Sequence, residues 1–297
     1  MNPYPAVFTD EMLLEEWLSH PGDELIECMR QLQGDIMILG VGGKMGPTLA
    51  RMAKRASDLA GIKRKVTGVS QFRTPGLRRE LEAQGIETLA GDLLDPSFIA
   101  LLPRAPLVYY LAGMKFGTGG NPSLTWAMNT YVPALVAGHF TGSRIVAFST
   151  GCVYPLVAAG SGGSRETDMA LPVGEYAQSC LGRERMFEYG SSVHKNPVAL
   201  IRLNYAVELR YGVLVDIALK VKNQVPVDLS MGYFNAIWQG DANDMIIRSI
   251  DHAASPARVL NITGPEELTV RETALKFASL LGTSVDFEGT ESDTALL

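Results

Sequence analysis

One short segment near the start of the chain constrains the fold more than any other part. Residues 35–46 read D-I-M-I-L-G-V-G-G-K-M-G, so the apolar run Ile36–Leu39 is followed at once by a glycine-rich turn. The run is typical of a buried parallel strand, and residues 47–60 have the pattern of a helix with proline in its first turn. A strand, a glycine turn and a helix N-terminus together form a binding site for phosphate groups.

The glycines of this turn indicate which phosphate compound it binds. Glycines let the backbone approach a pyrophosphate closely, and the unpaired N–H groups at the start of the helix point toward that group. An ordinary tight turn between a strand and a helix is the alternative interpretation. The dinucleotide site that the sequence predicts here consists of Gly40, Gly42, Gly43, Lys44, Met45 and Gly46.

Apolar runs and helical patterns alternate from residue 35 to about residue 200. The predicted strands are Ile36–Leu39, Lys65–Ser70, Thr88–Ala90, Leu107–Leu111, Arg144–Ser149 and Val198–Leu203, and the predicted helices are 47–60, 76–84, 123–139 and 174–190. This alternation predicts an α/β fold with a Rossmann-type, doubly wound parallel sheet. Right-handed crossovers would place the carboxyl ends of the strands at one edge, where the cofactor should bind.

The chain divides by pattern into three parts. Residues 1–33 form a helical extension that either packs on the core or covers a partner surface. Residues 34–204 form the predicted dinucleotide-binding domain, to which parts of the later chain return. Residues 205–297 form a smaller mixed lobe, in which the alternation is looser, and we expect this lobe to bind the substrate.

Composition argues against several classes of partner. The net charge is −6 and no basic run is present, so we expect neither nucleic acid nor a membrane as a partner. No apolar stretch reaches transmembrane length, and no signal peptide is visible. The cysteines Cys28, Cys152 and Cys180 do not suggest a disulfide framework, so a cytoplasmic location is expected. The histidines lack the spacing of metal ligands, so no metal is expected.

Seven segments carry a resemblance to a known family. They are Gly40-x-x-Gly43-x-x-Gly46, Gly91-Asp92-Leu93, Leu111-Ala112-Gly113-Met114-Lys115, Asn129, Ser149-Thr150-Gly151-Cys152-Val153-Tyr154, Arg202-Leu203-Asn204-Tyr205 and Asn261-Ile262-Thr263-Gly264. In this order they resemble the extended short-chain dehydrogenase/reductase family, the group of NAD-dependent epimerases and dehydratases. The resemblance covers roughly residues 35–285, although Ala206 and Val207 replace the family's usual glycine and proline.

The resemblance implies further contacts to the cofactor. Asp92 would meet the adenine ring, although a Gly-Asp pair is also common in plain turns. The remaining implied cofactor residues are Leu93, Leu111, Ala112, Gly113, Lys115, Asn129 and Tyr176. The resemblance also implies a small-molecule substrate and a homodimer, formed through helices 123–139 and 174–190.

The end of the second predicted strand bears on the choice between NAD and NADP. A carboxylate there would hydrogen-bond the ribose hydroxyls of NAD and repel a 2′-phosphate. The sequence has Ser70 and Arg73 in this region and no acid. A hydroxyl and a cation suit the 2′-phosphate, so NADP is favoured over NAD.

The resemblance also implies a catalytic set, in which one member is missing. Tyr176 would be the acid–base residue, and Thr150 would orient the substrate oxygen. The family's lysine, four residues after the tyrosine, lowers the tyrosine pKa through its charge. Here that position holds Cys180, whose thiol supplies no positive charge. Lys115 could compensate in part; Cys180 could be a buried filler or could do different chemistry.

Arg183, two turns after Tyr176 on the same predicted helix, is a second source of compensation, though a distant one.

Two functions follow from these patterns. The first is an NAD(P)-dependent oxidoreductase or epimerase that acts by hydride transfer on a sugar, a sugar nucleotide or another polar carbinol. The second is a dinucleotide-binding protein with little or no dehydrogenase activity, such as a redox sensor or an assembly partner.

Overall fold

The computed structural model describes residues 5, 7–115 and 120–297, and it divides into two compact units. Unit 1 comprises Met1–Ser149, Gly174–Ile201 and Asn243–Leu260, and unit 2 comprises Thr150–Val173, Arg202–Ala242 and Asn261–Leu297. The chain therefore passes between the units repeatedly, whereas the sequence suggested one main boundary near residue 204.

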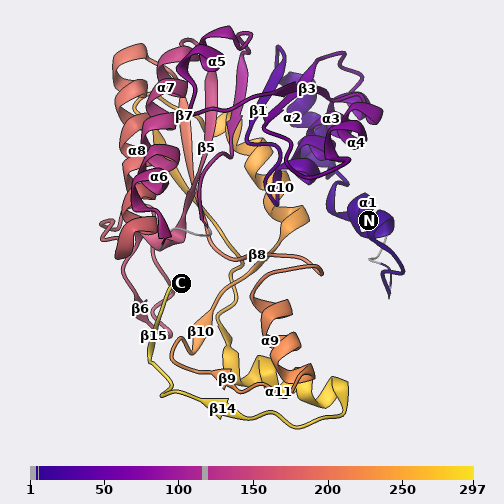
Figure 1. Cartoon of the computed structure of the whole chain (residues 1–297), viewed down its shortest axis with the longest axis vertical. Coiled ribbons are helices and arrows are strands. Elements are labelled where there is room, and N and C mark those ends of the chain that lie inside the picture. Colours follow the sequence, from indigo (N-terminus) through magenta and orange to yellow (C-terminus); the bar gives the residue numbers. More distant parts are fainter. Residues whose placement is uncertain (1–4, 6, 116–119) are drawn as a thin grey trace. The chain divides into compact units, whose positions relative to one another are not determined.

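Unit 1 is built on a seven-stranded sheet with the order β12-β7-β5-β4-β1-β2-β3 (Figure 1). Its strands are β1 (Ile36–Leu39), β2 (Val66–Ser70), β3 (Glu87–Ala90), β4 (Leu107–Tyr110), β5 (Arg144–Thr150), β7 (Val198–Leu203) and β12 (Arg258–Ile262). Strands β1 to β5 pair in parallel, and Leu39 lies opposite both Val69 and Tyr110. The predicted Rossmann-type α/β fold is confirmed.

Helices connect the strands of this sheet. They are α3 (Gly46–Leu59), α4 (Leu77–Ala83), α5 (Pro96–Leu101), α6 (Pro122–Trp126), α7 (Val132–His139), α8 (Gly174–His194) and α10 (Gln239–Arg248). Between α6 and α7 lies η2 (Ala127–Tyr131), a π-helical segment that contains Asn129. The predicted helix 123–139 is thus a continuous helical run with a π segment inside it, and this run packs beside α8 (Figure 1).

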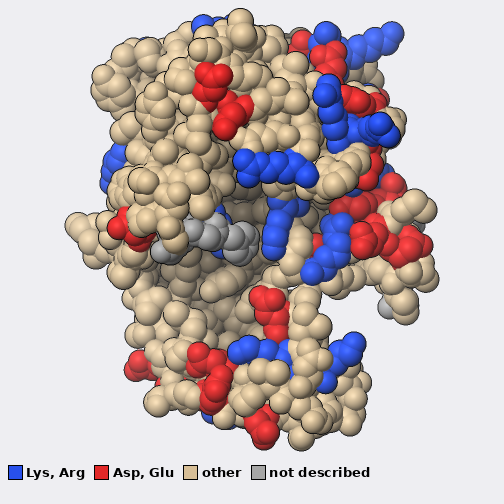
Figure 2. Space-filling view, in the orientation of Figure 1, with Lys and Arg blue, Asp and Glu red and all other residues tan. Residues whose placement is uncertain are grey.

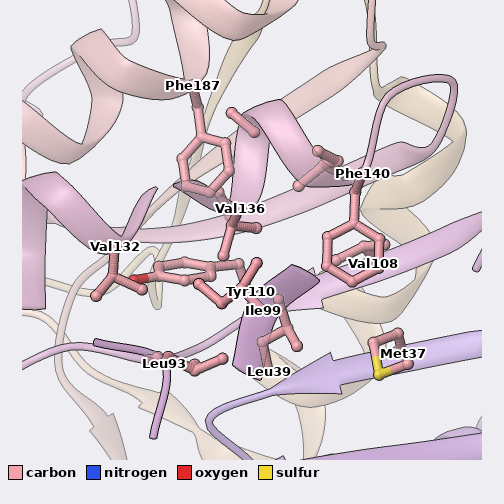
Figure 3. Close-up of a cluster of buried hydrophobic side chains, with 14 of the residues drawn as sticks. Met37, Leu39, Leu93, Ile99, Val108, Tyr110, Val132, Val136, Phe140 and Phe187 are labelled. Carbon is pink, nitrogen blue, oxygen red and sulfur yellow. The ribbon is translucent and has the colours of Figure 1, made fainter. Parts of the chain in front are cut away.

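The core of unit 1 fixes β4 against these helices. Figure 3 shows Phe187 of α8 with its ring directed toward the ring of Tyr110 of β4, and the two ring centroids are 5.1 Å apart in an edge-on arrangement. Val132, Val136 and further apolar side chains surround the pair, and all are buried. Burial of each such side chain contributes about 1.5–3 kcal/mol, so the end of β4 has a well-determined position relative to α8.

The N-terminal extension packs on the domain that follows it. It forms α1 (Glu11–Leu18) and α2 (Asp23–Gln31), and their apolar faces are buried. The Glu15 carboxylate accepts hydrogen bonds from Arg51 and Thr48 of α3, at 2.5 Å and 3.1 Å. Arg64 donates to the carbonyl oxygens of Met29 and Leu32, at 2.6 Å and 2.8 Å, and so caps the end of α2.

Unit 2 is smaller and mixed. Its main helices, α9 (Val213–Lys222) and α11 (Val270–Leu281), pack against each other over a core that includes Val221, Phe234 and Ala274. Its strands form four two-stranded sheets. They are β6 (Val157–Ala158) with β15 (Thr294–Ala295), β8 (Ala206–Val207) with β11 (Ile237–Trp238), β9 (Val227–Asp228) with β14 (Phe287–Glu288), and β10 (Tyr233–Phe234) with β13 (Leu268–Thr269).

The surface carries charges of both signs. On the face that Figure 2 shows, many Lys and Arg side chains lie close to Asp and Glu side chains. Within the described ranges, no helix is both long enough and apolar enough to cross a membrane.

Candidate functional site

The order of the strands marks one point on the carboxyl edge of the sheet. Strand β1 lies between β2 and β4, so the chain extends the sheet from β1 in both directions. In open α/β sheets, ligands bind at the carboxyl ends of the strands beside such a switch point. The Leu111 N–H donates to the Leu39 carbonyl at 2.8 Å, so the loops after β1 and β4 begin side by side.

Three of the four glycines after β1 are required by contacts inside the protein. Gly40 has a φ of +91°, and a Cβ there would lie 2.5 Å from the backbone nitrogen of Ala112. At Gly42, a Cβ would lie 2.3 Å from Ser70 Oγ, and at Gly46 it would lie 2.4 Å from a backbone carbonyl oxygen. These glycines therefore allow the loop to pack against β2, the start of α3 and the loop after β4.

Gly43 differs from the other three. It is exposed, its φ is not positive, and an added Cβ would meet only the Gly40 carbonyl oxygen, at 3.4 Å. The described protein atoms therefore do not explain why this position lacks a side chain. A ligand that approaches the backbone closely would explain it, as the pyrophosphate does at the corresponding glycine of dinucleotide-binding loops.

The start of α3 offers hydrogen-bond donors beside Gly43. The N-cap residue is Met45, and no side chain caps the first N–H groups of this helix. Unpaired N–H groups and the positive end of the helix dipole attract an anion. The predicted residues Lys44 and Met45 are therefore located where a phosphate would contact the chain, and Lys44 is exposed.

The end of β2 lies next to the glycine loop and carries no acid. Ser70 Oγ, against which Gly42 packs, accepts a hydrogen bond from the Phe72 N–H at 3.3 Å. Arg73 is exposed, and no carboxylate of the described residues pairs with it. This edge of the sheet therefore presents a hydroxyl and a cation, as the sequence suggested.

The residues after β3 have contacts within the protein itself. Asp92 Oδ1 accepts a hydrogen bond from the Leu94 N–H at 2.9 Å, so this side chain stabilises a local turn. Leu93 is buried in the core, where it packs beside Leu39 and Tyr110. Only the backbone of Leu93 remains for contact with a ligand, whereas Asp92 is half-buried.

Asn129 joins the loop after β4 to α8. Its Oδ1 accepts hydrogen bonds from the Met114 N–H, at 2.8 Å, and from Arg183 Nη2, at 2.7 Å. Its Nδ2 donates to the Met114 carbonyl at 3.0 Å and to Ser179 Oγ at 2.9 Å. The amide thereby fixes the backbone of the loop Leu111–Lys115, of which Gly113 and Lys115 are exposed.

Helix α8 carries the predicted catalytic residues. Tyr176 is half-buried, and its carbonyl oxygen accepts a hydrogen bond from Ser179 Oγ at 2.8 Å. The Cys180 side chain is fully buried. A thiol carries no positive charge and this one is buried, so the position provides neither a cation nor an exposed nucleophile.

Arg183 is a buried cation on the same helix. Its side chain donates to the Phe148 carbonyl at 2.8 Å in addition to Asn129, and its guanidinium carbon lies 5.8 Å from the centroid of the Tyr110 ring. Burial raises the pKa of Tyr110, and the Arg183 charge partly opposes this shift. Sequence spacing had suggested Arg183 as a distant source of a compensating charge.

Thr150 belongs to unit 2 and is the last residue of β5. Its Oγ1 accepts a hydrogen bond from the Cys152 N–H at 3.2 Å. Unit 2 also contains a polar pocket of about 160 Å³. Its lining includes Tyr154, Arg202 and Asn261, and Tyr154 donates to Asn261 Oδ1 at 2.8 Å.

The three cysteines are free thiols. The Cys28 thiol donates to Asp251, and burial, with a further contribution from this carboxylate, raises the pKa of Cys28 to about 12. No group of three or more His, Cys, Asp and Glu side chains that could hold a metal ion occurs in the part of the chain that the structure describes.

Known proteins share this fold at low sequence identity. No protein-family model matches the sequence, and no curated protein matches it. Among solved structures, the UDP-glucuronic acid 4-epimerase of Bacillus cereus in complex with NAD has a TM-score of 0.71 and 16% identity, over 86% of this chain and 87% of that chain. The epimerase Mth375 of Methanothermobacter thermautotrophicus has a TM-score of 0.71 and 18% identity, over 92% and 85%.

The enzyme WbmG of Bordetella bronchiseptica, in complex with NAD and UDP, has a TM-score of 0.70 and 15% identity, over 88% of this chain and 84% of that chain. The chain has the fold of these three proteins. Identities this low establish the fold alone, so the reaction has to be inferred from the residues of the site.

The two kinds of glycine in the loop predict different effects of an added side chain on stability. Gly46→Ala should lower the free energy of unfolding by about 1–3 kcal/mol, because its Cβ would overlap a backbone oxygen that cannot move freely. Gly43→Ala should change it by less than about 1 kcal/mol, because the position has room and an ordinary φ. Urea unfolding of both variants measures the difference, and equal losses would contradict this assignment.

Proposed function

We propose that unit 1 binds NADP or NAD and that the protein transfers a hydride between this cofactor and a polar carbinol, such as a sugar or a sugar nucleotide. The observation that carries the proposal is Gly43, an exposed glycine that no described protein contact requires, beside the uncapped start of α3. The solved structures of similar fold support it, since the Bacillus cereus epimerase is a complex with NAD and WbmG is a complex with NAD and UDP.

The residues of unit 1 fit a dinucleotide in a definite order. The start of α3 and Gly43 would hold the pyrophosphate, and the region of Ser70 and Asp92 would hold the adenosine half. The loop Leu111–Lys115, fixed by Asn129, would lie beside the nicotinamide half. When bound, the nicotinamide supplies the acceptor or donor of the hydride.

The hydroxyl proton of the carbinol is transferred separately from the hydride in this proposal. When the carbinol is oxidised, a phenolate at Tyr176 would take the hydroxyl proton, and the bound cofactor would supply the acceptor for the hydride. Thr150 orients the substrate oxygen, and Lys115 adds positive charge at the loop after β4. In the reverse direction, Tyr176 would return the proton to the substrate oxygen, and the reduced cofactor would supply the hydride.

Turnover tests the assignment of Tyr176. With NADP or NAD and a panel of sugars, sugar nucleotides and other polar carbinols, Tyr176→Phe should lose about 10²–10⁴-fold in kcat, because general acid–base catalysis is removed. Dinucleotide affinity should remain close to that of the parent protein. The assignment fails if the variant turns over the same substrate at the parent rate.

Cofactor binding itself is tested with Gly43→Ala. We expect this variant to bind NADPH about tenfold more weakly, a loss of about 1.4 kcal/mol, while its stability is retained. Titration by fluorescence measures the affinity. If the parent protein binds neither NADPH nor NADH, the proposed function is wrong.

We further propose that NADP is preferred to NAD, since Ser70 and the exposed Arg73 replace the acid that would repel a 2′-phosphate. Arg73→Ala should weaken NADPH binding about tenfold and leave NADH binding unchanged, because only NADPH carries that phosphate. Lys63→Ala, an exposed cation that precedes β2, is the matched control. A parallel loss for both cofactors would argue against a specific contact.

A second candidate function is favoured by one observation. Position 180 holds a fully buried thiol, where the resemblance implies a lysine. A protein that binds a dinucleotide with little or no dehydrogenase activity would need no such cation. Tight NADPH or NADH binding without turnover of any carbinol in the panel would favour this redox sensor or assembly partner.

We also propose that the protein forms a homodimer through the helical run α6, η2 and α7 and through α8. These helices pack together and carry exposed Trp126, Tyr131 and Tyr189, of which Tyr189 is 67% exposed. Light scattering should give about twice the chain mass of 32.1 kDa. Tyr189→Glu should shift the mass to that of the monomer, whereas Leu280→Glu on α11 should not. A monomeric parent protein would rule out the dimer.

A further inference from the structure

The position of Arg183 is explained neither by the proposed hydride step nor by the packing of the core. The side chain is 6% exposed. Both of its hydrogen-bond acceptors, the Phe148 carbonyl and Asn129 Oδ1, are uncharged, and no carboxylate of the described residues pairs with it. Nε has no hydrogen-bond partner in the described part of the chain. A buried charge without an opposite charge is costly, so a sequence that retains one indicates a use for the charge.

The guanidinium lies at the carboxyl edge of the sheet. A Cβ on Gly113 would lie 2.2 Å from Arg183 Nη2, so the guanidinium is packed directly against the backbone of this residue. Gly113 is exposed and belongs to the loop after β4. A negatively charged ligand that contacts this loop would therefore be only one residue away from a fixed positive charge in a poorly solvated environment.

The same guanidinium helps to hold the loop. Arg183 Nη2 and the Met114 N–H share the Oδ1 atom of Asn129, while Nη1 reaches the end of β5 at Phe148. Hydrogen bonds from a charged donor are about twice as strong as those between neutral groups. Arg183 thus combines a charge near the loop with two bonds that set the positions of its neighbours.

The charge is one turn away from the position where the resemblance implies a cation. Cys180 and Arg183 are three residues apart on α8, so they share a face of the helix, and both are buried. Two cations in this arrangement would repel each other strongly in the interior. A cation at position 183 therefore requires a neutral residue at position 180, and a cation at position 180 would require a neutral residue at position 183.

We propose that Arg183 is the positively charged positioning residue of the dinucleotide site and that it replaces a cation at position 180. Its charge favours the anionic cofactor, and its hydrogen bonds hold Asn129 and the loop Leu111–Lys115 in place. This inference rests on the proposed function for the identity of the ligand. The retention of a charge at one of two positions on α8 does not depend on that function and is tested separately.

The first experiment compares three variants of the intact protein in NADPH titrations followed by fluorescence. Arg183→Met removes the charge at similar length and should weaken binding at least about tenfold. Arg183→Lys keeps the charge and should bind within about threefold of the parent. Arg185→Met, which removes an exposed cation from the same helix, is the control and should bind normally. Parent-like binding by Arg183→Met would overturn the proposal.

The second experiment moves the charge back. Cys180→Lys alone should lower both the melting temperature and NADPH affinity, because it places two buried cations one turn apart. In the double variant Cys180→Lys/Arg183→Met, NADPH affinity should recover relative to Arg183→Met. Its loss of melting temperature should be smaller than the sum of the losses in the two single variants. Additive losses, or a gain of affinity in Cys180→Lys alone, would refute the replacement.

These outcomes separate the two proposals. If the parent protein binds no dinucleotide, the proposed function fails, and the melting temperatures of the Cys180 and Arg183 variants still test the relation between these positions. If the parent protein binds NADPH while Arg183→Met binds it equally well, the role of Arg183 fails and the proposed function stands.

Discussion

The close approach of two backbones at the carboxyl edge of the sheet is the constraint on which the candidate site depends. Gly40 adopts a φ of +91° and leaves no room for a side chain beside Ala112. Because β1 and β4 are neighbours, any displacement here would push the loop after β4 away from α8. Asn129 bonds both backbone groups of Met114, so the loop, the π segment and α8 maintain their arrangement together.

Much of the fold could be predicted from the sequence because its strands are short apolar runs. The predicted β1, Ile36–Leu39, has the observed bounds, and β2 and β4 each differ by one residue at one end. The helix α5 and the strand β12, which were not predicted, lack such a signal. Helix α5 has only six residues, and most of β12 is half-exposed. The π segment around Asn129 has no sequence pattern of its own, so the helix 123–139 was predicted without it.

Only part of the candidate site could likewise be predicted from the sequence. The glycine loop is a local motif, so its residues could be identified from spacing alone. The role of Arg183 could not, because it depends on which buried carbonyl oxygens surround a long side chain, and no spacing along α8 reveals them. The composition of unit 2 was also beyond sequence reasoning, since Thr150–Val173 joins it from the middle of the predicted first domain.

The path of the chain between the units has a consequence for how the protein is made. The sheet of unit 1 includes β7 and β12, and β12 at Arg258–Ile262 follows most of unit 2 in the sequence. During synthesis, β7 therefore lacks its outer neighbour in the sheet until β12 has been synthesised. Sheets assembled from such distant segments fold slowly and expose unpaired strand edges in the meantime. Chaperones would therefore be expected to protect the edge of β7 in the unfinished chain.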